Sequence, residues 1–243
     1  MSAMPTYRST LLDRKDVALR TMAFYFEKPA GFTFKAGQYI DLILSNPRAA
    51  GGENMLKHDF TIASAPFEPR LMIATRIRKS AFKETLEHMT LGTEVGIKGP
   101  SGSFFLHNDS ARPAVFIAGG IGITPFLSIV RDAMHRKLPH KMFLFYSNPT
   151  PEKIAFFSEF QKYKAQNPNF SFVATVTAEE PSPSWKGERN RVSGEMLKKY
   201  LPDLGSCTFY IAGPPGFSLA MRETLNTAGV DDDDIRSEEF AGY

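Results

Sequence analysis

The sequence predicts a chain of class β + α/β, in which an antiparallel barrel is followed by a parallel sheet flanked by helices. Residues 7–98 hold six short runs with partial apolar–polar alternation, separated by turn residues, which is typical of an antiparallel barrel. From residue 114 onward, apolar runs alternate with segments of helical spacing, which indicates β–α–β units and hence a parallel sheet. The change falls in a polar stretch that ends in Pro113, so we expect domains at residues 1–108 and 109–243.

The elements follow from these patterns in chain order. The six barrel strands are expected at residues 7–13, 17–27, 39–44, 60–64, 71–77 and 94–98. A short helix is expected at residues 81–89, because Leu86 and Met89 fall on one face. Five strands of the second domain are expected at residues 114–118, 142–146, 170–176, 208–212 and 235–239. Its helices are expected at residues 125–137, 152–165, 193–200 and 216–228.

A glycine turn follows the first apolar strand of the second domain. Its glycines are Gly119, Gly120 and Gly122. They stand where a side chain would block close approach of a ligand or restrict the backbone angles. Thr124 is predicted to cap the next helix and Pro125 to be its first residue. A strand, a glycine turn and a helix N-terminus suit an anion such as a pyrophosphate, although the glycines alone fit a tight turn in any α/β domain equally well.

A second turn of small residues follows the predicted strand at 208–212. It contains Gly213, Pro214 and Pro215. Because ligands of open α/β sheets bind at the carboxyl ends of the strands, the two turns could hold a dinucleotide between them. A purely structural turn is an equally good interpretation of this second motif.

Five motifs in this order resemble the ferredoxin–NADP reductase superfamily over essentially the whole chain. They are His-Asp-Phe-Thr-Ile-Ala-Ser at 58–64, Gly-Pro-Ser-Gly-Ser-Phe at 99–104, Gly-Gly-Ile-Gly-Ile-Thr-Pro at 119–125, Ala-Gly-Pro-Pro-Gly at 212–216 and the terminal Glu-Glu-Phe. The resemblance implies a Greek-key barrel that binds FAD and a Rossmann-like domain that binds NAD(P)H. It also implies hydride transfer to flavin N5 and a separate electron acceptor such as ferredoxin or flavodoxin.

The resemblance assigns flavin contacts to the 58–64 motif. Phe60 would lie beside the isoalloxazine ring, Thr61 would face flavin N5, and Ile62 and Ser64 would line the flavin cleft. His58 stands where relatives have the arginine that holds the flavin phosphate, and histidine is often neutral at pH 7. Four cations are near enough in sequence or sheet to compensate: Lys57, Arg76, Arg78 and Lys79.

The resemblance also places a short helix under the flavin pyrophosphate. Its first residues here are Ser80, Ala81, Phe82 and Lys83. At the chain end, Glu238 would lie at the reacting edge of the flavin, and Phe240 would cover the flavin face opposite Phe60. Tyr243 would reach toward the adenine half of FAD, although a terminus with two aromatics could also simply dock on the core.

The choice of coenzyme rests on few residues. After the strand predicted at residues 142–146, no lysine or arginine occurs until Lys153, which favours NADH. Arg189 and Arg191 could still reach the 2′-phosphate of NADPH. Two other functions remain open. One is an NAD(P)H-dependent reductase of free flavin or ferric chelates, favoured by His58, and the other is a nucleotide-binding regulatory module without turnover.

Composition excludes several classes of protein. The formal net charge of +3 is too small to indicate nucleic acid, and the histidines show no metal-ligand spacing. Cys207 is the only cysteine, so neither an internal disulfide nor a cluster held by four thiolates is possible. No run approaches the roughly 18 apolar residues of a membrane helix, so we expect a cytoplasmic protein without a membrane span. The oligomeric state stays open.

Overall fold

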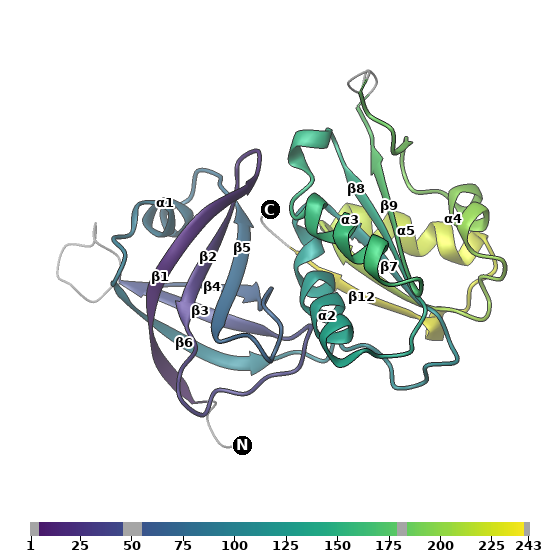
Figure 1. Cartoon of the computed structure of the whole chain (residues 1–243). Coiled ribbons are helices and arrows are strands. Elements are labelled where there is room, and N and C mark those ends of the chain that lie inside the picture. The colour runs from purple at the N-terminus through teal and green to yellow at the C-terminus, as the bar shows by residue number, and fades with distance from the viewer. Residues whose placement is uncertain (1–4, 46–54, 179–183, 241–243) are drawn as a thin grey trace.

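The computed structural model describes residues 5–45, 55–178 and 184–240, which form two lobes side by side (Figure 1). The first lobe is built from antiparallel strands and one helix. The second lobe is a parallel sheet with helices on its faces. The chain passes from the first sheet to the second between Ser101 and Ala114. The predicted domain boundary lies in this interval and stays a prediction.

The first lobe is a six-stranded antiparallel sheet with the strand order β4-β3-β6-β1-β2-β5. Its elements are β1 (Thr6–Ala18), β2 (Thr21–Glu27), β3 (Tyr39–Ser45), β4 (Met55–Thr61), β5 (Arg70–Arg76), α1 (Ala81–His88) and β6 (Glu94–Ser101). The two edge strands approach each other just past β4, where Ala63 N donates to Met72 O at 2.7 Å. This contact curls the sheet toward a barrel, as predicted.

Two strand predictions in this lobe were wrong in their bounds. The strand predicted at residues 60–64 begins at Met55 and ends at Thr61. It is an edge strand with Lys57 and Asp59 exposed, so it lacks the apolar run by which strands are identified. The first strand also runs on to Ala18, and the chain reverses at Leu19 and Arg20, where Arg20 has a φ of 54°.

The second lobe has the strand order β10-β9-β8-β7-β11-β12, with every pair parallel. Its strands are β7 (Ala114–Gly119), β8 (Met142–Asn148), β9 (Phe170–Val176), β10 (Glu188–Arg189), β11 (Thr208–Gly213) and β12 (Ile235–Glu239). Its helices are α2 (Ile123–Arg136), α3 (Phe157–Gln166), α4 (Gly194–Tyr200) and α5 (Pro215–Thr227). The predicted fold is confirmed, except that the sheet has six strands rather than five. The additional strand β10 holds two residues, too few to give a periodic pattern.

Single 3₁₀ turns interrupt the regular elements of the second lobe. They are Gly120–Gly122, Pro151–Lys153 and Asp232–Asp234. The helix predicted at residues 152–165 therefore begins only at Phe157, after the second of these turns. Among the described residues, no helix is long and apolar enough to cross a membrane.

The core continues from one lobe into the other. All residues of β7 and β11 are buried, which explains their unbroken apolar runs. One apolar cluster joins Ala63 and Met72 of the first lobe to Phe126 and Ile129 of α2. Burying a side chain such as Phe126 contributes about 1.5–3 kcal/mol, so this cluster holds the lobes against each other.

Candidate functional site

The glycine turn after β7 leads directly into α2. Gly120 has a φ of 57°, in the left-handed region that favours glycine, and starts the 3₁₀ turn Gly120–Gly122. The prediction that Thr124 caps the helix was wrong, because the 3₁₀ turn runs straight into α2 and Gly122 occupies the capping position. Thr124 lies inside the helix, and its hydroxyl donates to Ile121 O at 3.2 Å.

The turns after β7 and β11 lie against each other. A Cβ atom on Gly122 would lie 2.2 Å from Ala212 O. A Cβ atom on Gly119 would lie 2.8 Å from the Phe217 ring, and one on Gly213 would lie 2.6 Å from the same ring. These glycines therefore permit close approach of the two predicted turns, and the structure brings both turns to one edge of the sheet.

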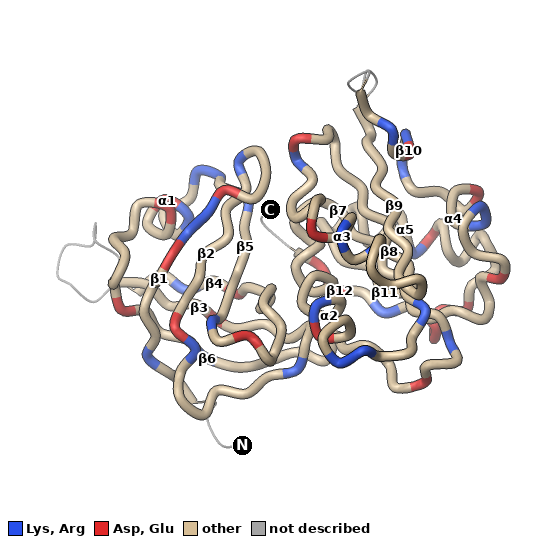
Figure 2. The backbone as a smooth tube through the Cα atoms, viewed as in Figure 1, with Lys and Arg blue, Asp and Glu red and all other residues tan. Residues whose placement is uncertain are grey.

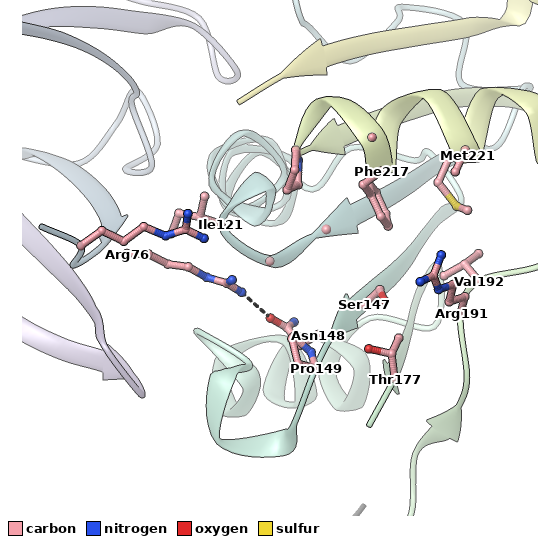
Figure 3. A pocket seen from close by; sticks show the side chains of 16 residues that line it. Arg76, Ile121, Ser147, Asn148, Pro149, Thr177, Arg191, Val192, Phe217 and Met221 are labelled. Carbon is pink, nitrogen blue, oxygen red and sulfur yellow. Dashed lines mark hydrogen bonds between the residues drawn. The ribbon is translucent and has the colours of Figure 1, made fainter. Parts of the chain in front are cut away.

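A cavity of about 340 Å³ opens at this edge, between the two lobes (Figure 3). Its lining includes residues of both turns, the ends of β8 and β9, and two arginines of the first lobe. The basic lining residues are Arg76, Arg78 and Arg191. Among the described residues the lining contains no carboxylate, so the cavity is suited to an anion.

Arg76 links the two lobes at this cavity. Its Nη2 donates to Asn148 Oδ1 at 3.2 Å and lies 2.5 Å from where a Cβ atom on Gly120 would stand (Figure 3). Burial lowers the pKa of Arg76, and the positive charge of Arg78 adds to this effect. A bound phosphate would offset both the burial of Arg76 and the repulsion from Arg78, because an anion stabilises the charged guanidinium.

The predicted flavin motif forms an aromatic stack in the first lobe. The His58 ring lies 4.8 Å from the Phe60 ring at an interplanar angle of 23°, and Phe82 of α1 lies 5.5 Å from each of them. His58 Nδ1 lies 2.9 Å from Asp59 O, so this nitrogen carries a proton that it donates to the carbonyl. In the neutral ring, Nε2 can then only accept a hydrogen bond.

The start of α1 presents cations and backbone amides. Ser80 caps the helix, with its Oγ accepting from Lys83 N at 3.2 Å. The Lys83 side chain is buried, and burial together with nearby Arg78 lowers its pKa to about 8. A buried ammonium beside a second cation and a helix N-terminus fits the diphosphate of FAD. Lys57 is committed elsewhere, since its Nζ lies 2.8 Å from Asp41 Oδ2.

Glu238 of β12 is half-buried near the junction of the lobes, and its Oε2 atom is buried. Its Oε2 has no hydrogen-bond partner among the described residues. Burial raises the pKa of Glu238 to about 7, and the negative charge of Asp59 from the first lobe contributes to the shift. A carboxyl with this pKa can hold or release a proton near neutral pH.

Phe240 and Phe60 belong to different apolar clusters. Phe240 N donates to Gly213 O at 2.9 Å, and its ring joins the cluster between the lobes. Phe60 joins the cluster inside the barrel. This separation fits two aromatics on opposite sides of a flavin, which stays a prediction. Tyr243 lies outside the described residues.

The remaining predicted flavin residues, Thr61, Ile62 and Ser64, are buried or hydrogen-bonded to other parts of the first lobe. Thr61 is buried at the end of β4, and Ile62 N donates to Gln38 O at 2.9 Å. Ser64 is fully buried, and its hydroxyl accepts from Met72 N at 2.9 Å, so this side chain holds the backbone around the predicted cleft. The sequence interpretation missed Asp59 and Phe217. A carboxylate inside the flavin motif and an aromatic one residue after the Gly-Pro-Pro-Gly turn were the available signals.

Comparisons with known proteins agree with this arrangement. A family model described as "Oxidoreductase NAD-binding domain" matches residues 116–223. The glycine betaine monooxygenase reductase subunit of Chromohalobacter salexigens is 26% identical over 226 residues, which cover 91% of this chain and 60% of the relative. A subunit of the Na(+)-translocating NADH-quinone reductase of Methylococcus capsulatus is 32% identical over 155 residues, which cover 62% of this chain and 38% of the relative. The matched segments thus span 38% to 60% of these relatives.

Solved structures share the fold over nearly the whole chain. A ferredoxin NADP+ reductase from Neisseria gonorrhoeae with bound FAD and NADP has a TM-score of 0.81 and 20% identity, with 96% of this chain and 98% of that chain covered. The FAD/NAD-binding domain of a nitric oxide dioxygenase from Vibrio cholerae has a TM-score of 0.84 and 19% identity, with the same coverage of 96% and 98%.

The barrel, the parallel sheet and the two opposed turns define a two-domain oxidoreductase fold with an oxidoreductase NAD-binding domain. Residues 116–223 of the second lobe thus match an oxidoreductase NAD-binding domain, and the whole chain shares its fold with FAD- and NAD(P)-binding reductases. These matches confirm the predicted fold and an NAD-binding domain in the second lobe, and they agree with the predicted resemblance to the ferredoxin–NADP reductase superfamily. The assignment of individual site residues stays a prediction.

Proposed function

We propose that this chain passes electrons from NAD(P)H to a separate protein acceptor through an FAD held at the junction of its lobes. The observation that carries the proposal is the meeting of the two predicted cofactor sites at this junction. Arg76, at the end of β5, lies over Gly120 of the coenzyme turn, and the negative charge of Asp59 in the flavin motif contributes to the raised pKa of Glu238.

Each group of residues has a defined part in this proposal. The FAD supplies the capacity to accept a hydride and to release electrons singly. Phe60 and Thr61 border its ring, and the amides at the start of α1 with Arg78 and Lys83 bind its diphosphate. The opposed glycine turns and Arg76 bind the coenzyme. Phe240 excludes water from the ring, and Glu238 holds or releases a proton at Oε2.

The proposal is tested by flavin content and turnover of the purified chain. We expect a yellow protein that keeps its colour through gel filtration and oxidises NADH or NADPH with ferricyanide as artificial acceptor. Loss of the flavin on the column, combined with reduction of added free flavin, would instead support the free-flavin or ferric reductase. That alternative is supported by the interactions of His58, which stacks on Phe60 and donates a hydrogen bond to the Asp59 carbonyl rather than presenting a permanent charge to a phosphate. Nucleotide binding without turnover would support the regulatory module.

The same assay decides the coenzyme. The predicted preference for NADH is opposed by one observation, the presence of Arg191 among the residues that line the cavity. NADPH carries an additional phosphate that an arginine binds well. A kcat/KM ratio in favour of NADPH that Arg191→Ala reverses would establish this role, whereas a preference for NADH in both proteins would exclude it.

A small electron carrier such as ferredoxin or flavodoxin is the proposed acceptor. The reductase subunits among the relatives support a protein acceptor. In Figure 2, basic positions gather at the upper end of the first lobe, over the β1–β2 hairpin and beside α1. The cavity there is lined by three cations, Arg20, Arg78 and Lys79, and also by three carboxylates, Asp16, Glu84 and Glu87. These opposite charges offset each other, so the surface marks no docking site. Reduction of an acidic carrier that slows as ionic strength rises would support an electrostatic encounter with the chain. A cytoplasmic location stays a prediction.

Substituting Phe240 with Ala should change both coenzyme binding and reactivity with oxygen. If the ring covers the flavin face, it occupies the place of the nicotinamide, so its removal should tighten NAD(P)+ binding roughly fivefold, which corresponds to about 1 kcal/mol of stacking. It should also speed attack of oxygen on the reduced flavin. Coenzyme titration and the oxidase rate measure these effects. Unchanged values for both would show that Phe240 only packs in the core.

Substituting His58 with Arg should tighten FAD binding. An always-charged guanidinium replaces a ring whose Nε2 accepts when neutral, and a charge-assisted contact with phosphate should lower the Kd roughly tenfold. Lys57→Ala is the matched control, because it removes a cation one residue away that pairs with Asp41. Flavin fluorescence titration gives both values. Equal Kd values for the His58 variant and the unaltered chain would contradict a phosphate site at this position.

A further inference from the structure

Helix α2 of the second lobe is hydrogen-bonded to the segment that follows β4 in the first lobe. Ser128 Oγ donates to Ser64 O at 2.7 Å, and both serines are fully buried. From its other side, the same segment is bonded to β5 by the Ala63–Met72 and Ser64–Met72 hydrogen bonds described above. The backbone beside the predicted flavin edge is therefore fixed between a strand of its own lobe and a helix of the other.

One turn further along α2, Arg131 makes a second connection between the lobes. Its Nη1 lies 3.2 Å from Glu68 Oε1, which also accepts from Ala65 N at 2.6 Å. Its other nitrogens bind Glu159 of α3, with Nε to Oε1 at 2.7 Å and Nη2 to Oε2 at 2.8 Å. Burial lowers the pKa of Arg131, but Glu159 and Glu68 outweigh burial and the net shift is upward. The guanidinium therefore stays charged between two carboxylates.

The same helix begins at the coenzyme turn. Ile123, the first residue of α2, follows the Gly120–Gly122 turn directly. At a rise of about 1.5 Å per residue, Ser128 and Arg131 stand roughly 8 and 12 Å along the axis from that turn. A hydrogen-bonded helix changes length very little, so α2 sets the separation between the coenzyme turn and the segment that it grips.

Apolar packing alone would not set this separation. The cluster of Ala63, Met72, Phe126 and Ile129 holds the lobes together, but hydrophobic contacts are non-directional and tolerate sliding. The hydrogen bonds from Ser128 and Arg131 are directional and end on atoms of residues 64–68. They therefore fix the register of the two lobes.

We propose that Ser128 and Arg131 are positioning residues for hydride transfer. Through Ser64 and Glu68 they hold the flavin-bordering segment at a fixed distance from the coenzyme turn, so that the two reacting rings meet. This inference rests on the proposed function. The expected effect on the rate of hydride transfer is large, because a misplacement of about 1 Å between reacting groups can slow a reaction roughly 100-fold.

The test compares two substitutions, each of which neutralises one of the two carboxylates that face Arg131. Glu68→Gln weakens the contact that crosses between the lobes and keeps an acceptor for Ala65 N, whereas Glu159→Gln weakens the contact between α2 and α3 within one lobe. In single-turnover reduction of bound flavin at saturating coenzyme, Glu68→Gln should be roughly tenfold slower, with the coenzyme Kd within about twofold. Glu159→Gln should stay within about twofold of the unaltered chain in both quantities.

Stability and amide exchange separate positioning from simple structural support. Both variants should lose similar thermal stability. Only Glu68→Gln should speed hydrogen exchange at the Ala65 amide, because a weaker contact with Arg131 lets residues 64–68 open more often even though the acceptor is kept. This exchange can be measured without flavin. If Glu68→Gln does not fold, Ser128→Ala replaces it with the same expected slowing. Equal reduction rates in the variants of the two glutamates, or an unchanged rate in Ser128→Ala, would overturn the inference. A chain that binds no flavin would overturn the proposed function instead. Unchanged Ala65 exchange in Glu68→Gln would then still count against the positioning role of Arg131.

Discussion

Replacing Gly120 with Val is expected to raise the KM for NADH and NADPH by at least about 100-fold, equivalent to about 2.7 kcal/mol, while the flavin content stays near that of the unaltered chain. Gly120 has a φ of 57°, so a β-branched residue strains the turn. Its Cβ would also stand 2.5 Å from Arg76 Nη2 and displace the guanidinium that joins the lobes at the coenzyme cavity. Steady-state kinetics and the flavin absorbance of the purified variant measure both effects.

Gly31→Val is the matched control for backbone strain. Gly31 has a φ of 75°, and a Cβ atom there would meet nothing within 4 Å. The Gly31→Val variant should lose roughly 1–3 kcal/mol of unfolding free energy to backbone strain, as the Gly120 variant does, but its KM should not change. If the Gly120 variant folds and keeps both Michaelis constants, the turn after β7 does not bind the coenzyme.

Glu238→Gln should slow reduction of the flavin by NAD(P)H roughly tenfold or more and should remove the pH dependence of this step near pH 7. The carboxyl has a pKa of about 7, so it changes its protonation across the neutral range, whereas the amide cannot titrate. Coenzyme affinity should change little, because Glu238 is absent from the residues lining the coenzyme cavity. Stopped-flow reduction across the pH range provides the measurement. Glu239→Gln, at the neighbouring exposed position of β12, is the control.

The same pKa predicts the direction of a stability change. Glu238 titrates at about 7 in the folded chain, against its ordinary value of 4.5. Between these values the folded state binds more protons than the unfolded state, so the free energy of unfolding falls as pH rises through this window. A shift from 4.5 to about 7 corresponds to a fall on the order of 3 kcal/mol, which should vanish in Glu238→Gln. A variant with the same pH dependence as the unaltered chain would show that another group titrates there.

The sequence predicts the long buried elements of this fold well. Strands β7 and β11 lie in the centre of a sheet covered on both faces, and this burial requires the unbroken apolar runs that identify them. The two glycine turns could also be placed, because each directly follows one of these runs. The elements that escaped prediction are held by tertiary contacts. Strand β10 pairs for two residues with β9, and the polar edge strand β4 is specified by its pairing with β3.

The candidate site was predictable where motifs are contiguous and was not where two lobes contribute single residues. His58, Phe60 and Phe82 come together because β4 and α1 carry them, as the motif order suggested. The contact of Arg76 with Asn148 joins residues 72 positions apart, and no local pattern encodes it. The capping position of α2 was misassigned for a local reason, since a 3₁₀ turn of glycines has no side-chain signature.

The Phe217 ring has a consequence for how related sequences can diverge. The nearest obstacle to a side chain at Gly119 and at Gly213 is this ring, and at Gly213 the Cα atom of Gly119 also stands 3.3 Å from an added Cβ; the obstacle at Gly122 is the backbone of the opposite turn. A smaller residue at position 217 would therefore remove the main obstacle to alanine at Gly119 or at Gly213, but the close approach of these two glycines disfavours alanine at both. A change at position 217 should therefore precede a change at either glycine. No side-chain exchange can relieve Gly122, so along any lineage that keeps these turns this glycine has no neutral path to another residue.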